Sequence, residues 1–186
     1  MTWCPSNKFY LQGAITCIAC FVLAAGLPQL VIALTLDDGA LPAAILAPAS
    51  EVRVLDGDTI QIKGTRYRLY GIDCPEKKQA FGFEAKAAVE EILKNVQDLR
   101  IEKMGHERYG RTLAVIHVDE DTLQNKLVRQ GYAWVYTRYC RDMRCAKWIW
   151  NQSLAKRERV GLWMDDCPMP PWQWRKKHAA SQPKNI

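Results

Sequence analysis

The sequence predicts an α+β fold: a small closed barrel of about five short strands that carries about three helices. Three observations predict this class: short segments in which apolar and polar residues alternate, longer segments with helical periodicity, and the order strands, helix, strands, helix. A doubly wound parallel sheet would need strands and helices that alternate at crossover length, and this chain lacks that pattern. Its 186 residues suffice for one well-buried domain with appendages.

The strands fall into two groups. β-Branched and aromatic residues alternate with polar ones in "EVRVLDGDTIQI" (51–62) and "TRYRLYGI" (65–72), which a Lys63-Gly64 turn separates. This pattern predicts two or three antiparallel strands. "LRIEKM" (99–104) and "TLAVIHV" (112–118) predict two more, on either side of the polar loop "GHERYGR".

Three segments predict helices. In "FGFEAKAAVEEILKNV" (81–96) apolar residues recur at helical spacing and charged residues fill the other face. "TLQNKLVRQ" (122–130) predicts a short helix closed by Gly131, and 141–160 a third that stops at Gly161. The segment 164–186 contains four of the nine prolines and several basic residues, so we expect an irregular tail.

The N-terminal segment differs from the rest of the chain. "FYLQGAITCIACFVLAAG" (9–26) has only two polar interruptions and no polar face at helical period, so 1–36 is interpreted as an export signal or a membrane anchor. The Ala- and Pro-rich segment 37–50 is expected to be a linker, and 51–163 the folded domain. We therefore expect an exported protein, periplasmic or secreted, that could keep a membrane contact through this segment.

Four of the seven cysteines lie beyond the export segment. Cys140 and Cys145 could close a short loop in an oxidising compartment. A zinc site is disfavoured because the spacings are irregular and no histidine is close to them. The formal net charge of +6 favours a polyanionic partner, although many soluble proteins are moderately basic.

"DGDT" (56–59) ends the first strand. Residues two apart on a strand face the same way, so Asp56 and Asp58 could bring two carboxylates together, and Gly57 would allow close backbone approach. Such oxygen ligands suit Ca²⁺ or a similar cation. An Asp-Gly turn between strands is also common and needs no metal.

Charged residues also border a buried strand in "RLYGIDCPE" (68–76). A strand from Arg68 to Asp73 can bring a guanidinium and a carboxylate to one rim, and Pro75 could turn Glu76 to the same place. Arginine offers a planar fork that matches a phosphate, although a plain surface ion pair would explain the same residues. "ERYGR" (107–111) supplies a second arginine, Arg111, just before a strand.

Together "DGDT", "RLYGIDCPE" and "ERYGR", followed by "LVRQGYAWVY" and "GLW", resemble the staphylococcal nuclease, or thermonuclease-like, family over about residues 51–163. The resemblance implies a five-stranded OB-like barrel with helices. It also implies Ca²⁺-dependent hydrolysis of DNA and RNA to products with a 3′-phosphate.

The resemblance also assigns roles to individual residues. It places the calcium carboxylates on Asp58 and Asp73, a backbone carbonyl ligand on Cys74, and a supporting acidic residue on Asp56. It places the phosphate-binding arginines on Arg68 and Arg111, and on Glu76 the carboxylate that activates water. Arg108, Tyr109 and Tyr139 would contact the nucleotide. Thr137 stands where the family has a second tyrosine, which Tyr132 or Tyr136 could replace, although neither is assigned to the site.

Two other functions fit parts of the sequence. A barrel of this kind can bind nucleic acid without cleaving it, but every key position here has the functional residue type. An exported adaptor protein would use the Trp-rich C-terminal segment as an interaction surface. We expect a monomeric nuclease.

Overall fold

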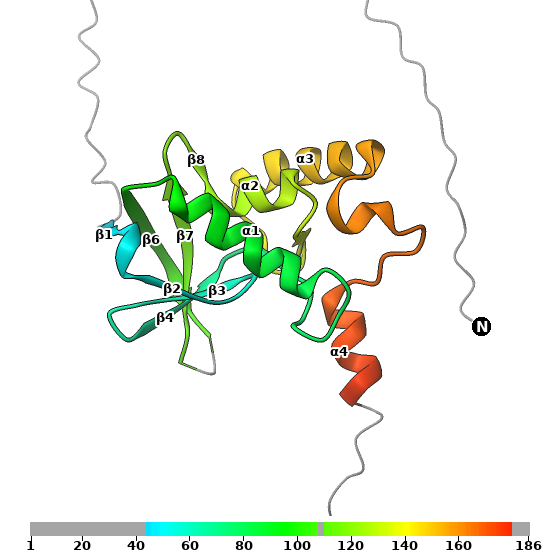
Figure 1. The fold of residues 1–186 in the computed structure, drawn as a ribbon, viewed down its shortest axis with the longest axis horizontal. Coiled ribbons are helices and arrows are strands. Elements are labelled where there is room, and N and C mark those ends of the chain that lie inside the picture. The colour runs from blue at the N-terminus through cyan, green and yellow to red at the C-terminus, as the bar shows by residue number, and fades with distance from the viewer. Residues whose placement is uncertain (1–43, 108–109, 180–186) are drawn as a thin grey trace, which may run out of the picture. The chain divides into compact units, whose positions relative to one another are not determined.

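A computed structural model describes residues 44–107 and 110–179 of the chain (Figure 1). The segment 1–36, the first half of the expected linker, and the predicted nucleotide contacts Arg108 and Tyr109 lie outside these ranges. Within the described part of the chain, no helix is both long and apolar enough to cross a membrane.

One seven-stranded sheet forms the β part of the fold, in the order β1-β6-β7-β4-β3-β2 with β8 added to β7. The five predicted strands are confirmed as β2 (Val52–Asp56), β3 (Thr59–Ile62), β4 (Thr65–Leu69), β6 (Asp98–His106) and β7 (Thr112–Val118). The sheet curls, and the helices lie beside it, so the α+β class and the OB-like architecture are confirmed (Figure 1).

The pairing of β4 with β7 brings distant parts of the chain together. These two strands are parallel, with Tyr67 opposite Thr112 and Arg68 opposite Leu113, whereas the β2–β3, β3–β4 and β6–β7 pairs are antiparallel. Arg111 immediately precedes β7. The two predicted phosphate-binding arginines therefore lie close in the fold, Arg68 in β4 and Arg111 just before the neighbouring strand β7.

Three short strands were not predicted, and the strand predicted from Arg68 to Asp73 is divided in two, because β4 ends at Leu69 and a separate strand begins at Ile72. β1 (Ile45–Pro48) pairs with β6 and buries Ala47, so the expected linker 37–50 extends too far and its last residues belong to the sheet. A 3-10 turn, Ala49–Glu51, leads from β1 into β2. β8 (Asp121–Thr122) extends β7, and β5 (Ile72–Asp73) pairs with β9 (Trp134–Val135) in a separate two-stranded sheet.

The three predicted helices are confirmed as α1 (Gly82–Lys94), α2 (Leu123–Arg129) and α3 (Arg144–Glu158). The prediction of an irregular tail is wrong, because a 3-10 turn (Gly161–Met164) is followed by a fourth helix, α4 (Pro171–Ala179). Pro171 occupies the first helical position, where the missing N–H removes no hydrogen bond.

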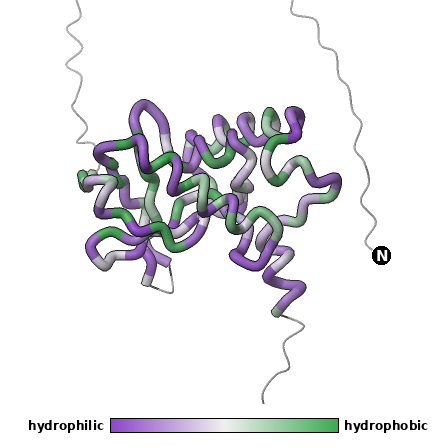
Figure 2. Tube along the Cα trace, in the orientation of Figure 1, coloured by the Kyte–Doolittle hydropathy of each residue, from purple (hydrophilic) through white to green (hydrophobic). Residues whose placement is uncertain are grey.

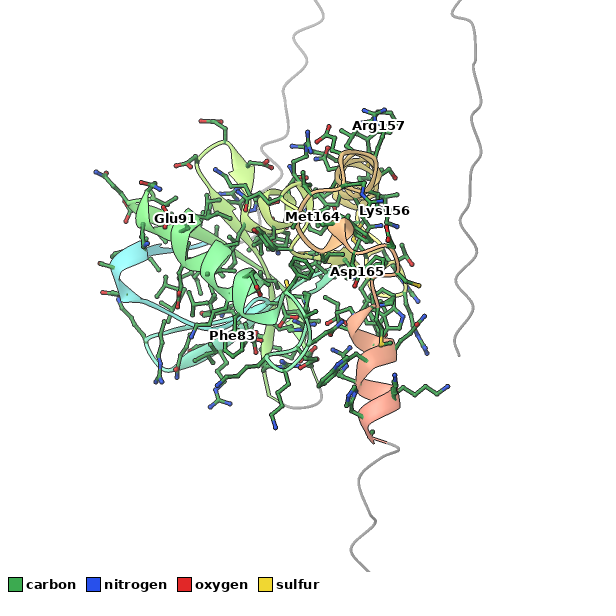
Figure 3. All side chains as sticks on the ribbon, turned by 45° about the vertical axis from the view of Figure 1, so that its right-hand side comes forward. Phe83, Glu91, Lys156, Arg157, Met164 and Asp165 are labelled. Atoms are coloured by element: carbon green, nitrogen blue, oxygen red, sulfur yellow. A yellow bond between two sulfur atoms is a disulfide. The ribbon has the colours of Figure 1, made fainter. Side chains whose placement is uncertain are left out.

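The main core lies between the sheet and the helices α1, α2 and α3, and apolar segments mark it in Figure 2. Its largest fully buried side chain is Trp148 of α3. A second buried cluster, Ala155, Leu162 and Trp163, packs with Phe81 and Trp134. Lys156 at the end of α3 and Met164 in the following turn lie beside this cluster (Figure 3). This second cluster joins the end of α3 to the segment that leads to α4.

A disulfide joins Cys140 to Cys145, with the two Cα atoms 5.7 Å apart. Cys140 packs against Gly71, where φ is +74° and an added Cβ would lie 2.7 Å from the Cys140 sulfur. A glycine is therefore needed at residue 71 for both its backbone conformation and its close packing. The disulfide ties the segment that carries Tyr139 to the start of α3.

Candidate active site

The first part of the site is the turn between β2 and β3. The backbone N–H of Asp58 donates to Asp56 Oδ1 at 3.1 Å, so Asp56 holds the turn. Gly57 packs closely against Cys74 and Ala85. A Cβ atom added at residue 57 would lie only 2.8 and 2.9 Å from their Cβ atoms, so a larger residue would not fit. The sequence prediction that this glycine permits close approach is confirmed.

Asp58 points inward from this turn and its side chain is only 11% exposed. Its Oδ1 accepts from the Thr59 hydroxyl at 3.1 Å and its Oδ2 accepts from the Cys74 backbone N–H at 3.1 Å. These bonds fix the orientation of the carboxylate and link the turn to the chain after β5.

Arg68 of β4 lies between two buried carboxylates. Its Nη2 donates to Asp73 Oδ1 at 2.7 Å, and its Nη1 forms an ion pair with Asp58 Oδ2. The side chain of Asp73 is fully buried, on a strand held by the β5–β9 pairing. Because a buried charge is stable only when it is paired, Arg68, Asp58 and Asp73 form one interdependent unit.

Arg111 joins this unit through a hydroxyl group. Its Nη1 is 3.4 Å from Thr59 Oγ1, the same hydroxyl that donates to Asp58. Its Nε donates to Glu107 Oε2 at 2.7 Å, and its side chain is 32% exposed. The second arginine is therefore oriented by Glu107 and remains accessible to a ligand.

Glu76 lies at the turn after Pro75. The backbone N–H of Gln79 donates to the Glu76 carbonyl at 2.7 Å, and the Glu76 N–H donates to Gln79 Oε1 at 3.2 Å. The Glu76 side chain is 36% exposed, in contrast to Asp73. Two carboxylates a few residues apart thus have different solvent access, as a proton acceptor and a buried ligand would require.

The family profile described as "Staphylococcal nuclease homologue" matches residues 66–165, more than half of the chain. The chain belongs to the staphylococcal nuclease family. The match ends before α4 begins at Pro171.

Individual nucleases align over a longer range. An "Uncharacterized endonuclease" of Haemophilus influenzae is 35% identical over 131 residues, which are 68% of this chain and 71% of that protein. A "Micrococcal nuclease" of Shigella flexneri is 34% identical over 138 residues, covering 67% and 78%. For "Staphylococcal-like nuclease CAN1" of Arabidopsis thaliana the identity is 34% over 139 residues, but the chain spans only 41% of that protein.

Cys74, the predicted backbone ligand, directly follows β5. Its thiol is buried and lies 3.1 Å from the carbonyl oxygen of Gly57, and burial raises the pKa of the thiol far above its ordinary value. The sulfur therefore stays protonated and is neither a nucleophile nor a thiolate ligand. The prediction that only the backbone of Cys74 serves the staphylococcal nuclease site stays open.

Tyr139 is 57% exposed at the edge of the site. Its ring meets that of Tyr136 edge-on, with centroids 4.9 Å apart, and Tyr136 in turn stacks on Trp172 of α4 at 4.8 Å. Tyr136 lies one residue before Thr137, where the staphylococcal nuclease family has a tyrosine. The aromatic surface beside the site therefore includes two residues that the motifs did not assign, Tyr136 and Trp172.

Arg175 of α4 is a further residue beside the site that the sequence did not predict. Its Nη2 donates to Asp73 Oδ2 at 2.7 Å, and its Nη1 donates to Glu76 Oε1 at 2.5 Å and Asp73 Oδ1 at 3.2 Å. Burial opposes the charged form of Arg175, but the hydrogen bonds to Asp73 and Glu76 raise its pKa above its ordinary value. A guanidinium from outside the region matched by the family profile thus contacts Asp73 and Glu76, two of the predicted site residues.

The acidic residues of the site are paired with the guanidinium groups of Arg68 and Arg175. Among the described residues, no group of three or more His, Cys, Asp or Glu side chains is placed to hold a metal ion. Both oxygens of Asp73 are engaged by guanidinium groups, as is one oxygen of Asp58. In this arrangement guanidinium groups neutralise the carboxylates.

Proposed function

We propose that the chain is a calcium-dependent nuclease that hydrolyses phosphodiester bonds of DNA, RNA or both to products with a 3′-phosphate. Its family makes it a hydrolase that acts on phosphodiester bonds. The observation that supports the proposal most strongly is the convergence of Asp58 and Asp73 on Arg68. Arg111 is linked to Asp58 through the Thr59 hydroxyl, and Glu76 is linked to Asp73 through Arg175.

The donor set fits a hard cation. Asp58 and Asp73 converge on one guanidinium, so their carboxylates already create a place where positive charge is stabilised. Oxygen ligands of this kind suit Ca²⁺, which takes six to eight of them including water. Asp58, Asp73 and the backbone carbonyl of Cys74 would hold the ion, and when bound it would supply Lewis-acid polarisation of a phosphate oxygen.

The two arginines would bind and orient the phosphate. A guanidinium has five N–H donors, more than the contacts of Arg68 with Asp58 and Asp73 use. Arg111, accessible beside Thr59, offers a second fork. Donors that are oriented before the reaction stabilise the charge that develops on the phosphate oxygens.

Glu76 would accept the proton of the attacking water. Its side chain is partly exposed and lies on the same guanidinium as buried Asp73, so it reaches both solvent and the carboxylate cluster. No covalent protein nucleophile is required, since water is the attacking group and the Cys74 thiol is buried and protonated.

Metal dependence gives the direct test. The full-length protein should degrade DNA or RNA with Ca²⁺ and lose this activity in a calcium chelator, because Asp58 and Asp73 provide the ligands. The Asp73→Asn variant should be inactive at every Ca²⁺ concentration. The control is Asp119→Asn, which replaces an exposed acidic residue outside the site and should behave like wild type. End-group analysis of the products should find 3′-phosphates.

Full activity in chelator would contradict the calcium assignment. Nucleic-acid binding without cleavage, under all metal conditions, would favour the non-catalytic barrel.

We also propose that the protein is exported, because 9–26 is a nearly continuous apolar run and the structure contains a disulfide. Disulfides persist in oxidising compartments such as the periplasm. Non-reducing peptide mapping of protein isolated from its native cells should find the peptide with Cys140 and Cys145 two hydrogens lighter than its reduced form. Free thiols at both positions would argue against export.

A further inference from the structure

Helix α4 is held to the rest of the molecule by few side chains. Six of its nine residues are exposed, and Pro171 is its only buried residue. Before the helix, Gln79 Nε2 donates to the Met169 carbonyl at 2.6 Å, which ties the connecting segment to the turn that carries Glu76. In Figure 1, α4 projects from the body of the fold beyond the start of α1. An element with so little buried surface can be displaced at low cost.

The main polar anchor of α4 is Arg175. Its guanidinium donates hydrogen bonds to Asp73 Oδ2 and Glu76 Oε1. It also donates to Asp73 Oδ1, which accepts a second hydrogen bond from Arg68. A cation that binds Asp73 must therefore replace at least one of these contacts. Arg175 is the easier to replace, since its side chain is 44% exposed and that of Arg68 only 11%.

The aromatic anchor of α4 is Trp172. Its ring lies parallel to that of Tyr136, with an angle of 8° and a centroid distance of 4.8 Å, and contacts Trp134 edge-on at 5.7 Å. Stacked aromatic rings are the arrangement by which such proteins bind nucleic-acid bases. Trp172 thus covers the face of the Tyr136 ring, next to Tyr139, as a stacked base would.

We propose that α4 is an internal competitor of the nuclease site, in which Arg175 occupies Asp73 and Glu76 in place of the divalent cation, and Trp172 covers Tyr136 in place of a base. This inference rests on the proposed calcium-dependent activity. Cation binding then requires release of Arg175, and release of Arg175 frees Glu76 and exposes the aromatic face.

The test is calcium affinity, measured by titration calorimetry on the full-length protein without substrate. Arg175→Ala should lower the apparent Kd for Ca²⁺ about tenfold, as expected when the binding-competent state rises from about a tenth of the population to nearly all of it. Lys176→Ala is the matched control: it removes the same charge from the next residue of α4, which is exposed and makes no contact with Asp73 or Glu76 in the described residues. Its Kd should change less than about twofold, the size of a screened surface effect.

Hydrogen exchange gives a second readout that does not depend on activity. Backbone amides of 172–179 should exchange faster when Ca²⁺ is added to the wild-type protein, because the helix is released. In Arg175→Ala they should exchange fast with or without Ca²⁺, while amides of β7 stay protected in both proteins. Trp172→Ala should also lower the Kd for Ca²⁺, since it removes the other anchor.

The possible results separate this proposal from the calcium proposal. Equal and measurable Ca²⁺ affinity of wild type, Arg175→Ala and Lys176→Ala would overturn the role of α4 and leave the metal site intact. Absence of Ca²⁺ binding in all three proteins would overturn both. Unchanged Ca²⁺ affinity with lower activity of Arg175→Ala would show that Arg175 binds substrate, and would also overturn the competition.

Discussion

An Arg68→Lys variant should stay folded and lose about 10²–10³-fold in kcat, the effect of removing one preorganised donor to developing charge. Lysine keeps a positive charge between Asp58 and Asp73, so the buried carboxylates remain paired. It loses the planar fork, which is the feature that matches two phosphate oxygens. Binding of a substrate strand should change far less than kcat, because attraction to the polyanion depends mainly on charge.

The matched control is Arg129→Lys. Arg129 also forms a bidentate pair with a carboxylate, Glu158, but between α2 and α3. Steady-state hydrolysis, strand binding and circular dichroism on both variants give the comparison. An Arg68→Lys enzyme with the kcat of the Arg129→Lys enzyme, and an intact fold, would mean that Arg68 serves only to neutralise Asp58 and Asp73.

A Glu76→Gln variant should lose about 10²–10⁴-fold in kcat, the range expected for removal of a general base. Glutamine keeps the size of the side chain and loses the proton acceptor. Asp73 still holds Arg175 through two hydrogen bonds, so α4 should not be released fully. KM should change little, because Glu76 would act on water and not on the phosphate.

Glu91→Gln provides the control for this substitution. Glu91 lies on α1, where Figure 3 labels it, and pairs with Lys94 on the surface. Loss of one such exposed ion pair has little effect on stability. Equal kcat for the two variants, measured at saturating Ca²⁺ and substrate, would rule out Glu76 as the base.

Local patterns in the sequence predicted most of the barrel. Alternation of apolar and polar residues in 51–72 and 99–118 identified β2, β3, β4, β6 and β7, although β3 and β7 are largely buried on both faces. The two-residue strand β9 could not be predicted, since a segment of that length has no period, and the pattern did not show the break between β4 and β5. β1 was hidden in an Ala- and Pro-rich segment and depends on its pairing with β6.

Helix α4 shows the limit of this reasoning. Its segment "PWQWRKKHA" has little apolar periodicity, and its position depends on contacts with Tyr136, Asp73 and Glu76, far away in the sequence. Pro171, followed by eight residues without another proline, is a helix-start signal that could have indicated α4. Tertiary contacts of this kind are not encoded in the local pattern.

Local motifs likewise identified the site only in part. "RLYGIDCPE" correctly indicated that Arg68 and Asp73 meet, and the family resemblance, not the motif "DGDT" alone, placed Asp58 with them. Thr59, which links Arg111 to Asp58, lies within "DGDT" and could have been named from its hydroxyl. Arg175 could not, since 102 residues separate it from Asp73.

The parallel pairing of β4 with β7 also bears on when this protein becomes able to act during its synthesis. A chain still on the ribosome can form the β2–β3–β4 meander early, but Arg68 gains its neighbouring strand only after Leu113 has emerged. Contacts between distant residues form late in folding. A half-made nuclease therefore lacks its second arginine while it is closest to messenger and ribosomal RNA.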